Sequence, residues 1–163
     1  MNWNNQKGSL LIEVLLSISL AAVFSLAIGN LIGANHQLVV ASKQEVKATA
    51  YAKESMEQLF AIKQSDWNKI SGFSEGYYQI EEVGSEFQIV PLSNPAVPEQ
   101  ELDGKYYRTI HIGKAYRDAL GNLSETGTED AQARRLDVKI TWQERNSTRD
   151  IEFASYITNW KGQ

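Results

Sequence analysis

Lys7-Gly8-Ser9-Leu10-Leu11-Ile12-Glu13 begins the stretch that decides the fold of this chain, and a long apolar run follows it. Between Leu10 and Gly33, Glu13 is the only charged residue. A membrane-spanning helix needs roughly 20 mostly apolar residues, so this run is long enough to cross a bilayer. A carboxylate costs on the order of 2–3 kcal/mol at the centre of such a helix and less near its end. Glu13 is therefore expected to have a partner or a function.

The spacing suggests which group could be the partner of Glu13. Cleavage between Gly8 and Ser9 would give Ser9 a free α-amino group, four residues before Glu13 at the start of a helix. The positive amine and the carboxylate could then neutralise each other, within one chain or between neighbouring chains. A carboxylate in the first turn also suits the helix dipole.

This pattern resembles the N-terminus of the type IV pilin superfamily, which comprises pilins, minor pilins and the pseudopilins of type II secretion and competence systems. The family has a short basic leader ending in Gly and, after the cleavage site, an apolar helix with Glu at its fifth position. The resemblance implies that a prepilin peptidase/methyltransferase cleaves after Gly8 and N-methylates Ser9. It also implies that Glu13 pairs with a subunit N-terminus during filament assembly, so other pilin subunits and membrane lipid are the expected partners.

Two departures from the family pattern favour a minor member. Ser9 stands where a large apolar residue is usual, and Asn30 stands where many major pilins have a helix-kinking Pro. Residues 66–68, Asp-Trp-Asn, and the closing residues 156–160, Tyr-Ile-Thr-Asn-Trp, resemble minor pilins of the PilV type.

We therefore expect a pilin-like α+β fold, in which a long N-terminal helix packs against a small antiparallel sheet. The expected organisation is a leader peptide at residues 1–8, a transmembrane and assembly half of the helix at 9–37, and an exported globular domain at 38–163. Lys7 is a positive-inside signal, so the N-terminus is expected in the cytoplasm, with a single pass through the inner membrane. The later location would be a cell-surface pilus or a pseudopilus.

The residues after the apolar run are expected to continue the same helix, to a total of about 55 residues or roughly 80 Å. No Pro or Gly lies between Leu38 and Ile62. Spacings of three and four predict one buried stripe on this half, formed by Val39, Ser42, Val46, Thr49, Ala50, Met56, Leu59 and Phe60. The helical pattern breaks at residues 65–68, and Trp67 is expected in the core.

After Gly76 the apolar residues recur with a period of two, which indicates strands. The expected strands are residues 77–81, 87–90, 106–112, 136–142 and 151–160. The first two form a predicted hairpin across Gly84-Ser85. Loops are expected at 91–98, which holds the three prolines, and at 118–130, with a turn at 145–148.

Within the apolar run, Gly29 and Gly33 form a G-x-x-x-G pattern. Two interpretations stay open. The glycines could let another helix approach closely, or they could be incidental residues that add local flexibility.

Composition argues against several kinds of chemistry. The 163-residue chain has no Cys, only His36 and His111 as histidines, and a formal net charge of −4. Thiolate chemistry is therefore absent, and neither a catalytic set nor a metal-ligand spacing is recognisable. No basic stripe favours nucleic acid. The acids of loop 118–130 (Asp118, Glu125, Glu129 and Asp130) could gather a calcium ion, but their spacing fits no EF-hand and a solvated acidic loop is expected. We expect no enzyme activity, no cofactor and no metal.

The function that these observations favour is that of a minor type IV pilin, a structural subunit that takes part in pilus assembly or modification. A pseudopilin of a type II secretion or competence system is the alternative within the same class. A single-pass, membrane-anchored exported binding domain or enzyme is the alternative of a different class.

Overall fold

The computed structural model describes residues 4–92 and 99–159, with side chains from Leu10 onward. The chain divides into two compact units, Met1–Gln44 and Glu45–Gln163. Helix α1, Asn4–Ser65, runs through the first unit and supplies the start of the second. The expected boundary at 37/38 falls a few residues earlier, because it follows the end of the apolar run.

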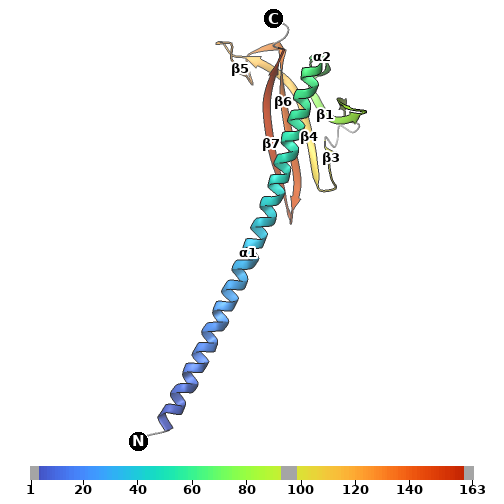
Figure 1. Ribbon diagram of the computed structural model, residues 1–163. Helices are drawn as coiled ribbons and strands as arrows, with labels where there is room; N and C mark the ends of the chain where they lie inside the picture. Colours follow the sequence, from blue (N-terminus) through green and yellow to red (C-terminus); the bar gives the residue numbers. More distant parts are fainter. Residues whose placement is uncertain (1–3, 93–98, 160–163) are drawn as a thin grey trace. The chain divides into compact units, whose positions relative to one another are not determined.

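In the second unit, the described strands form one seven-stranded antiparallel sheet. They are β1 (Gly76–Val83), β2 (Glu86–Pro91), β3 (Gln100–Glu101), β4 (Tyr106–Arg117), β5 (Leu123–Ser124), β6 (Thr128–Glu144) and β7 (Ser147–Thr158). The order is β2-β1-β4-β6-β7, with β3 and β5 paired to β4. The part of α1 after residue 44 lies along one face of this sheet (Figure 1). The expected α+β fold, with a long N-terminal helix packed against an antiparallel sheet, is confirmed.

The two long central strands give the sheet an apolar face and a polar face. Ile110 lies opposite Val138 and Ile112 lies opposite Leu136, so these four side chains share the face that packs under α1, and all are buried. His111 lies between the two isoleucines and is only partly buried on the other face. This two-residue period is the physical basis of the expected strands 106–112 and 136–142.

Both hairpins turn through a residue with positive φ. Gly84 has φ 71° between β1 and β2, and Arg145 has φ 56° between β6 and β7. Two-residue hairpin loops favour such conformations because they match the twist of the flanking strands. The first turn is where the sequence places it. The second turn consists only of Arg145 and Asn146, because Ser147, the first residue of β7, already pairs with Glu144 of β6.

The predicted stripe on the second half of α1 is partly wrong. The buried residues are Ala48, Ala52, Ser55, Met56, Leu59 and Ile62, whereas Val46, Thr49 and Ala50 are exposed and Phe60 is half-buried. Val39 and Ser42 belong to the first unit and are exposed. At its start in this unit, the helix meets the sheet through small residues, which allow the backbones to approach closely. The prediction assigns Thr49 and Ala50 to the buried side, where the structure has Ala48 and Ala52.

Several boundaries also need correction. Strand β4 continues past residue 112 to Arg117, and residues 123–124 and 128–130 of the expected acidic loop belong to β5 and β6. Gly127 makes this return possible, because its φ is 136° and a Cβ there would lie 2.1 Å from the Arg117 carbonyl oxygen. Helix α1 ends at Ser65 as expected, the short helix α2 spans Asn68–Ser71, and Trp67 packs partly buried against the core. Residues 93–98 and Trp160 lie outside the described part of the chain.

Candidate functional site

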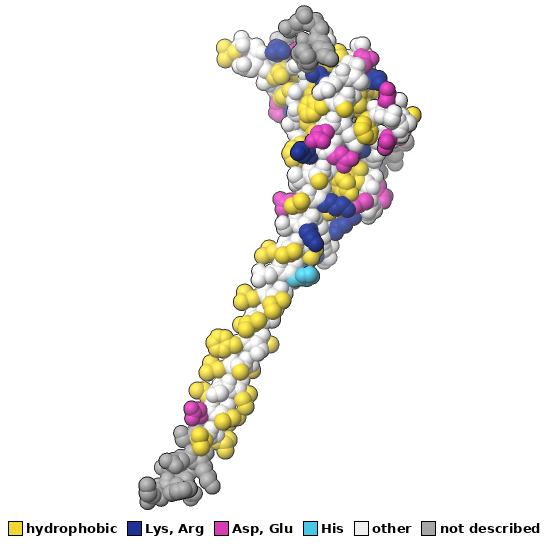
Figure 2. Space-filling model, viewed as in Figure 1, with side chains coloured by type: hydrophobic (Ala, Val, Ile, Leu, Met, Phe, Trp, Pro, Cys, Tyr) yellow, Lys and Arg dark blue, Asp and Glu magenta, His cyan; other side chains and the backbone are white. Residues whose placement is uncertain are grey.

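The first unit is a helix that presents apolar side chains in every direction. From Leu10 to Ile32 its large apolar side chains are between 51 and 71% exposed. Figure 2 shows these side chains all along this half of the helix. Among the described residues, α1 is the one helix long and apolar enough to cross a membrane. A helix that is apolar all round needs an apolar environment on every side, which lipid or neighbouring helices provide.

The serines of this run do not interrupt its apolar character as much as their side chains suggest. Ser17, Ser19 and Ser25 each donate their hydroxyl hydrogen to the carbonyl oxygen four residues earlier, at 2.8 Å in every case. A polar group that is satisfied inside its own helix is cheaper to place in hydrocarbon than an unsatisfied one. The moderate polarity of the sequence is therefore compatible with a membrane environment.

The predicted cleavage and assembly residues all lie in the first turns of α1. Gly8 and Ser9 have helical backbone, but their surroundings lie outside the described side chains. Glu13 is exposed, and its carboxylate makes no ion pair or hydrogen bond with any side chain described. Ser17 bonds only to the main-chain oxygen of Glu13. The carboxylate therefore remains available to a group from outside this part of the chain.

Gly29 and Gly33 have open space where a Cβ would stand, with no atom within 4 Å. Nothing in the first unit therefore requires glycine at these positions, although each costs about 1 kcal/mol of helix stability relative to Ala. Both interpretations of the G-x-x-x-G pattern remain compatible with this geometry.

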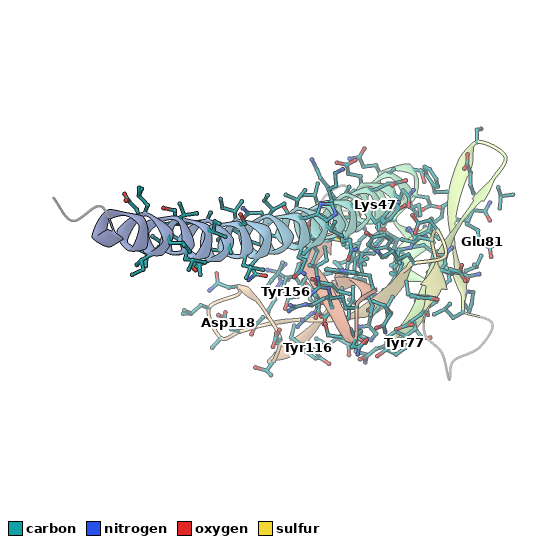
Figure 3. All side chains as sticks on the ribbon, turned by 90° about the horizontal axis from the view of Figure 1, so that it is seen from below. Lys47, Tyr77, Glu81, Tyr116, Asp118 and Tyr156 are labelled. Carbon is teal, nitrogen blue, oxygen red and sulfur yellow. The ribbon has the colours of Figure 1, made fainter. Side chains whose placement is uncertain are left out.

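The polar face of the sheet carries an ionic cluster around His111. The His111 Nδ1 lies 3.4 Å from the Asp137 Oδ2, and the Arg135 Nε donates to the other oxygen of Asp137 at 2.8 Å. The cluster borders an open pocket of about 200 Å³, lined also by Glu75 and Tyr116. Figure 3 shows Tyr116 on the side of the sheet away from α1. The described pocket lining contains no Ser or Thr hydroxyl beside His111 that could act as a nucleophile.

The four acids considered for calcium are each engaged by other groups. Asp118 accepts hydrogen bonds from the main-chain N–H groups of Leu120 and Asn122, which hold the pKa of its carboxyl below the usual value. The other three form ion pairs: Glu125 with Arg135, Glu129 with Lys114 and Asp130 with Arg117. In the described residues no group of three or more potential metal ligands comes together. Two of these ion pairs join β4 to β6, and the pair of Glu125 with Arg135 joins the segment after β5 to β6.

Arg108 is the feature that the sequence analysis misses. It lies on the helix-facing side of β4 and is only 6% exposed. Its guanidinium donates to Ser55 Oγ at 2.9 Å and Gln58 Oε1 at 3.3 Å on α1, to the Ile80 carbonyl oxygen at 3.4 Å on β1, and from Nε to Gln100 Oε1 at 3.2 Å on β3. One side chain thus connects four elements. A basic residue at an inward position between Tyr106 and Ile110 is the signal that identifies it in the sequence.

No carboxylate among the described residues accepts a hydrogen bond from Arg108. All its hydrogen-bond acceptors are neutral, and burial lowers the pKa of its guanidinium to about 10 although Glu54 nearby acts in the opposite direction. Arg108 borders an open pocket of about 230 Å³. Because its donors are already used and Glu54 and Glu82 also line the pocket, the arrangement fits a structural connection better than an anion site.

A second contact joins α1 to the connection between β3 and β4. Lys47 forms an ion pair with Asp103, which also accepts a hydrogen bond from the Tyr51 hydroxyl at 3.0 Å. The hydrogen bond from Lys47 is the main reason that the pKa of Asp103 lies below its usual value. The Lys47 ammonium also lies 5.4 Å from the centre of the Tyr106 ring. Together with Arg108, this contact fixes the register of the helix on the sheet.

Comparisons with protein-family models, with curated proteins and with solved structures return no match for this chain. The N-terminal motif and the physical properties of the two units are therefore the features that bear on function.

Proposed function

We propose that this chain is a minor type IV pilin, a non-enzymatic structural subunit that is processed at the membrane and assembled through its N-terminal helix. The observation that carries the proposal is an exposed, predominantly apolar helix with a single carboxylate near its start, directly after Lys7-Gly8-Ser9. In this proposal residues 1–8 are removed, Ser9 is N-methylated, and the second unit is exported from the inner membrane.

The free-energy cost of the charged Glu13 in an apolar helix gives a physical reason for assembly. A lone carboxylate in an apolar helix is unfavourable before assembly and becomes tolerable when it pairs with a positive N-terminus. That difference favours docking of each subunit at one depth, with its helix in register with its neighbours. A plain membrane anchor has no need for such a residue.

The first test is mass spectrometry of the mature N-terminus. We expect a chain that begins at methylated Ser9, and we expect Gly8→Val to block cleavage, because a side chain at that position would obstruct close approach of the peptidase. An intact Met1 terminus on the exported protein would contradict the proposal, as would unchanged processing of Gly8→Val.

The second test separates a filament subunit from a plain anchor. Glu13→Ala and Glu13→Gln should leave export intact and lower the ratio of subunit in sheared filaments to subunit in membranes, measured by immunoblot. Membrane insertion itself should improve by up to about 2–3 kcal/mol, so poor anchoring cannot explain a loss. Ser17→Ala is the matched control, since it removes a hydroxyl that is satisfied within the helix, one turn away. An unchanged ratio in both Glu13 variants would favour the plain anchor.

A further inference from the structure

The chain contains two Asn-x-Ser/Thr sequences in which x is not Pro. They are Asn122-Leu123-Ser124, which ends in β5, and Asn146-Ser147-Thr148, which begins in the turn between β6 and β7. Asn-x-Ser/Thr is the acceptor sequence for an N-linked sugar in exported proteins, where the sugar is joined to the Asn side chain. Such a short sequence also occurs by chance, so the local structure has to decide which of the two an enzyme can use.

The second sequence lies at the free end of a hairpin. Strand β4 pairs with β6 only as far as Trp142, which lies opposite Tyr106. Beyond this point, residues 143–144 of β6 pair only with residues 147–148 of β7 in the described sheet. Every residue from 145 to 150 is exposed. A ribbon of only two strands is marginally stable in water, so this end opens at a lower free-energy cost than the rest of the sheet.

The groups that an acceptor sequence needs are accessible here. The side chain of Asn146 is exposed and forms no hydrogen bond with any residue described. Gln143 Nε2 donates to Thr148 Oγ1 at 2.9 Å, so the Thr148 hydroxyl is an acceptor in this contact and keeps its own hydrogen. The Ser147 hydroxyl donates to the Glu144 carbonyl oxygen at 3.1 Å and leaves the Asn146 amide untouched.

The first sequence is held much more firmly. Asn122 Nδ2 donates to Asp118 Oδ2 at 3.2 Å, and the Asn122 main-chain N–H donates to the other oxygen of that carboxylate at 2.9 Å. Arg117 Nη1 donates to the Gly121 carbonyl oxygen at 2.6 Å and holds the same loop. Ser124, which supplies the hydroxyl of this sequence, is half-buried in β5. An enzyme could use this amide only after breaking the contacts of the loop.

We propose that Asn146 is the acceptor of an N-linked sugar and that Asn122 is not. A membrane-bound transferase joins Asn146 Nδ2 to C1 of a sugar that is carried on a polyprenyl diphosphate. The bond between C1 and the diphosphate oxygen breaks, the diphosphate leaves with the electron pair, and the amide proton passes to a base of the transferase. This inference rests on the export that is part of the proposed function, and it does not require filament assembly.

The position suits a bulky and hydrated group. The nearest buried residue that precedes Asn146 is Trp142, and the side chains between them are exposed or half-buried. A sugar at the tip of the turn therefore stays in water and displaces no core contact.

The test is peptide mass spectrometry of the full chain from the cells that naturally produce it. Exported chains are captured with a membrane-impermeant, amine-reactive biotin reagent after the outer membrane is permeabilised. Cleavage after Glu then releases residues 145–152 and residues 102–125 as separate peptides. We expect the mass of whole sugar units on peptide 145–152 and none on peptide 102–125.

Variants identify the acceptor atom and the sequence around it. Asn146→Gln and Thr148→Ala should each abolish the added mass, because the first moves the amide and the second removes the required hydroxyl. Thr148→Ser is the matched control, since it keeps the hydroxyl and should keep the sugar. Asn122→Gln should leave the sugar unchanged. The captured fraction of each variant shows whether it is exported.

Three results would overturn the inference: an unmodified peptide 145–152 in exported chains, a sugar on peptide 102–125 in its place, or an added mass that persists in Asn146→Gln. The last result would locate the sugar on a hydroxyl group. Cleavage after Gly8 combined with unmodified Asn146 would refute this inference alone. An intact Met1 on chains that carry the sugar would refute the proposed function alone, and a chain that is never exported would contradict both.

Discussion

Replacing Arg108 by Lys should destabilise the second unit more than replacing it by Met, although Lys conserves the charge. The reason is the arrangement of the acceptors. They lie on α1, β1 and β3, and a planar guanidinium with five N–H groups reaches all of them. A lysine ammonium places three donors at a single point and cannot span the same distance.

The magnitudes follow from burial and from the hydrogen bonds. Burial lowers the guanidinium pKa to about 10, and this corresponds to about 3 kcal/mol of unfavourable free energy for the buried charge. Arg108→Lys keeps a buried charge and loses at least two hydrogen bonds of about 1.5 kcal/mol each, so a loss of about 2–4 kcal/mol is expected. Arg108→Met removes the charge and keeps most of the volume. The Ile80 oxygen still accepts from the Gln100 side chain at 3.1 Å. A loss below about 2 kcal/mol is expected.

The assay is urea unfolding of a chain that starts at Leu38, monitored by tryptophan fluorescence. We expect this shortened chain to fold as a soluble monomer. Arg149→Lys is the matched control, because that side chain is 61% exposed and pairs with Glu144 at the surface. It should change the free energy of unfolding by less than about 0.5 kcal/mol. If Arg108→Met proves less stable than Arg108→Lys, the charge itself stabilises the fold and the reasoning is wrong.

Three further predictions concern the packing of helix and sheet. Trp142→Ala should cost about 3–5 kcal/mol, and a loss below about 1 kcal/mol would contradict its core position. Trp142→Phe should cost less, because the Trp142 Nε1 is buried without a hydrogen-bond partner and its removal relieves that penalty. Ala52→Leu should lower the free energy of unfolding by about 1–3 kcal/mol through overpacking, whereas Ala50→Leu, on the exposed side, should be nearly neutral. Equal effects of the two variants would contradict the assignment of Ala52 to the row that packs on the sheet. The Lys47–Asp103 contact should stabilise the unit fully above the unfolded-state pKa of Asp103, and this stabilisation should be lost as pH falls through the lower folded-state pKa. In Asp103→Asn, the free energy of unfolding should therefore lack this part of its dependence on acid pH.

The strands were predictable because their pattern has a short and exact period. Leu136, Val138 and Ile140 alternate with polar residues, and a period of two assigns each side chain to a face without any knowledge of the partner strand. The hairpin at Gly84 was predictable for a similar reason, since a two-residue turn requires a residue that tolerates positive φ. The extension of β4 to Arg117 was not, because it depends on the return of the chain at Gly127.

The helix row that meets the sheet was harder to predict, because small residues lie on both sides of the helix: Ala48 and Ala52 are buried, and Thr49 and Ala50 are exposed. Ala48 and Ala52 are weakly hydrophobic on any scale, and Val46 is a stronger apolar signal although it is exposed. The distance between α1 and the sheet determines which row is buried. Small residues let α1 approach the sheet closely, and the larger Met56 and Leu59 fill the space further along the helix. Hydrophobicity alone carries no information about that distance.

Two charges interrupt apolar patterns in this chain, and burial separates their roles. Arg108 replaces an apolar residue in the inward series of β4, and the second unit surrounds it with neutral acceptors from three other elements. The free-energy cost of burying this charge and the hydrogen bonds that offset the cost therefore belong to the same folded unit. Glu13 replaces an apolar residue in the first unit and has no partner among the described side chains. A buried, bonded charge is explained by the fold that encloses it. An exposed, unpaired charge in an apolar helix calls for a partner supplied from elsewhere, and this is the physical reason to seek the function of the first unit in contacts with other chains.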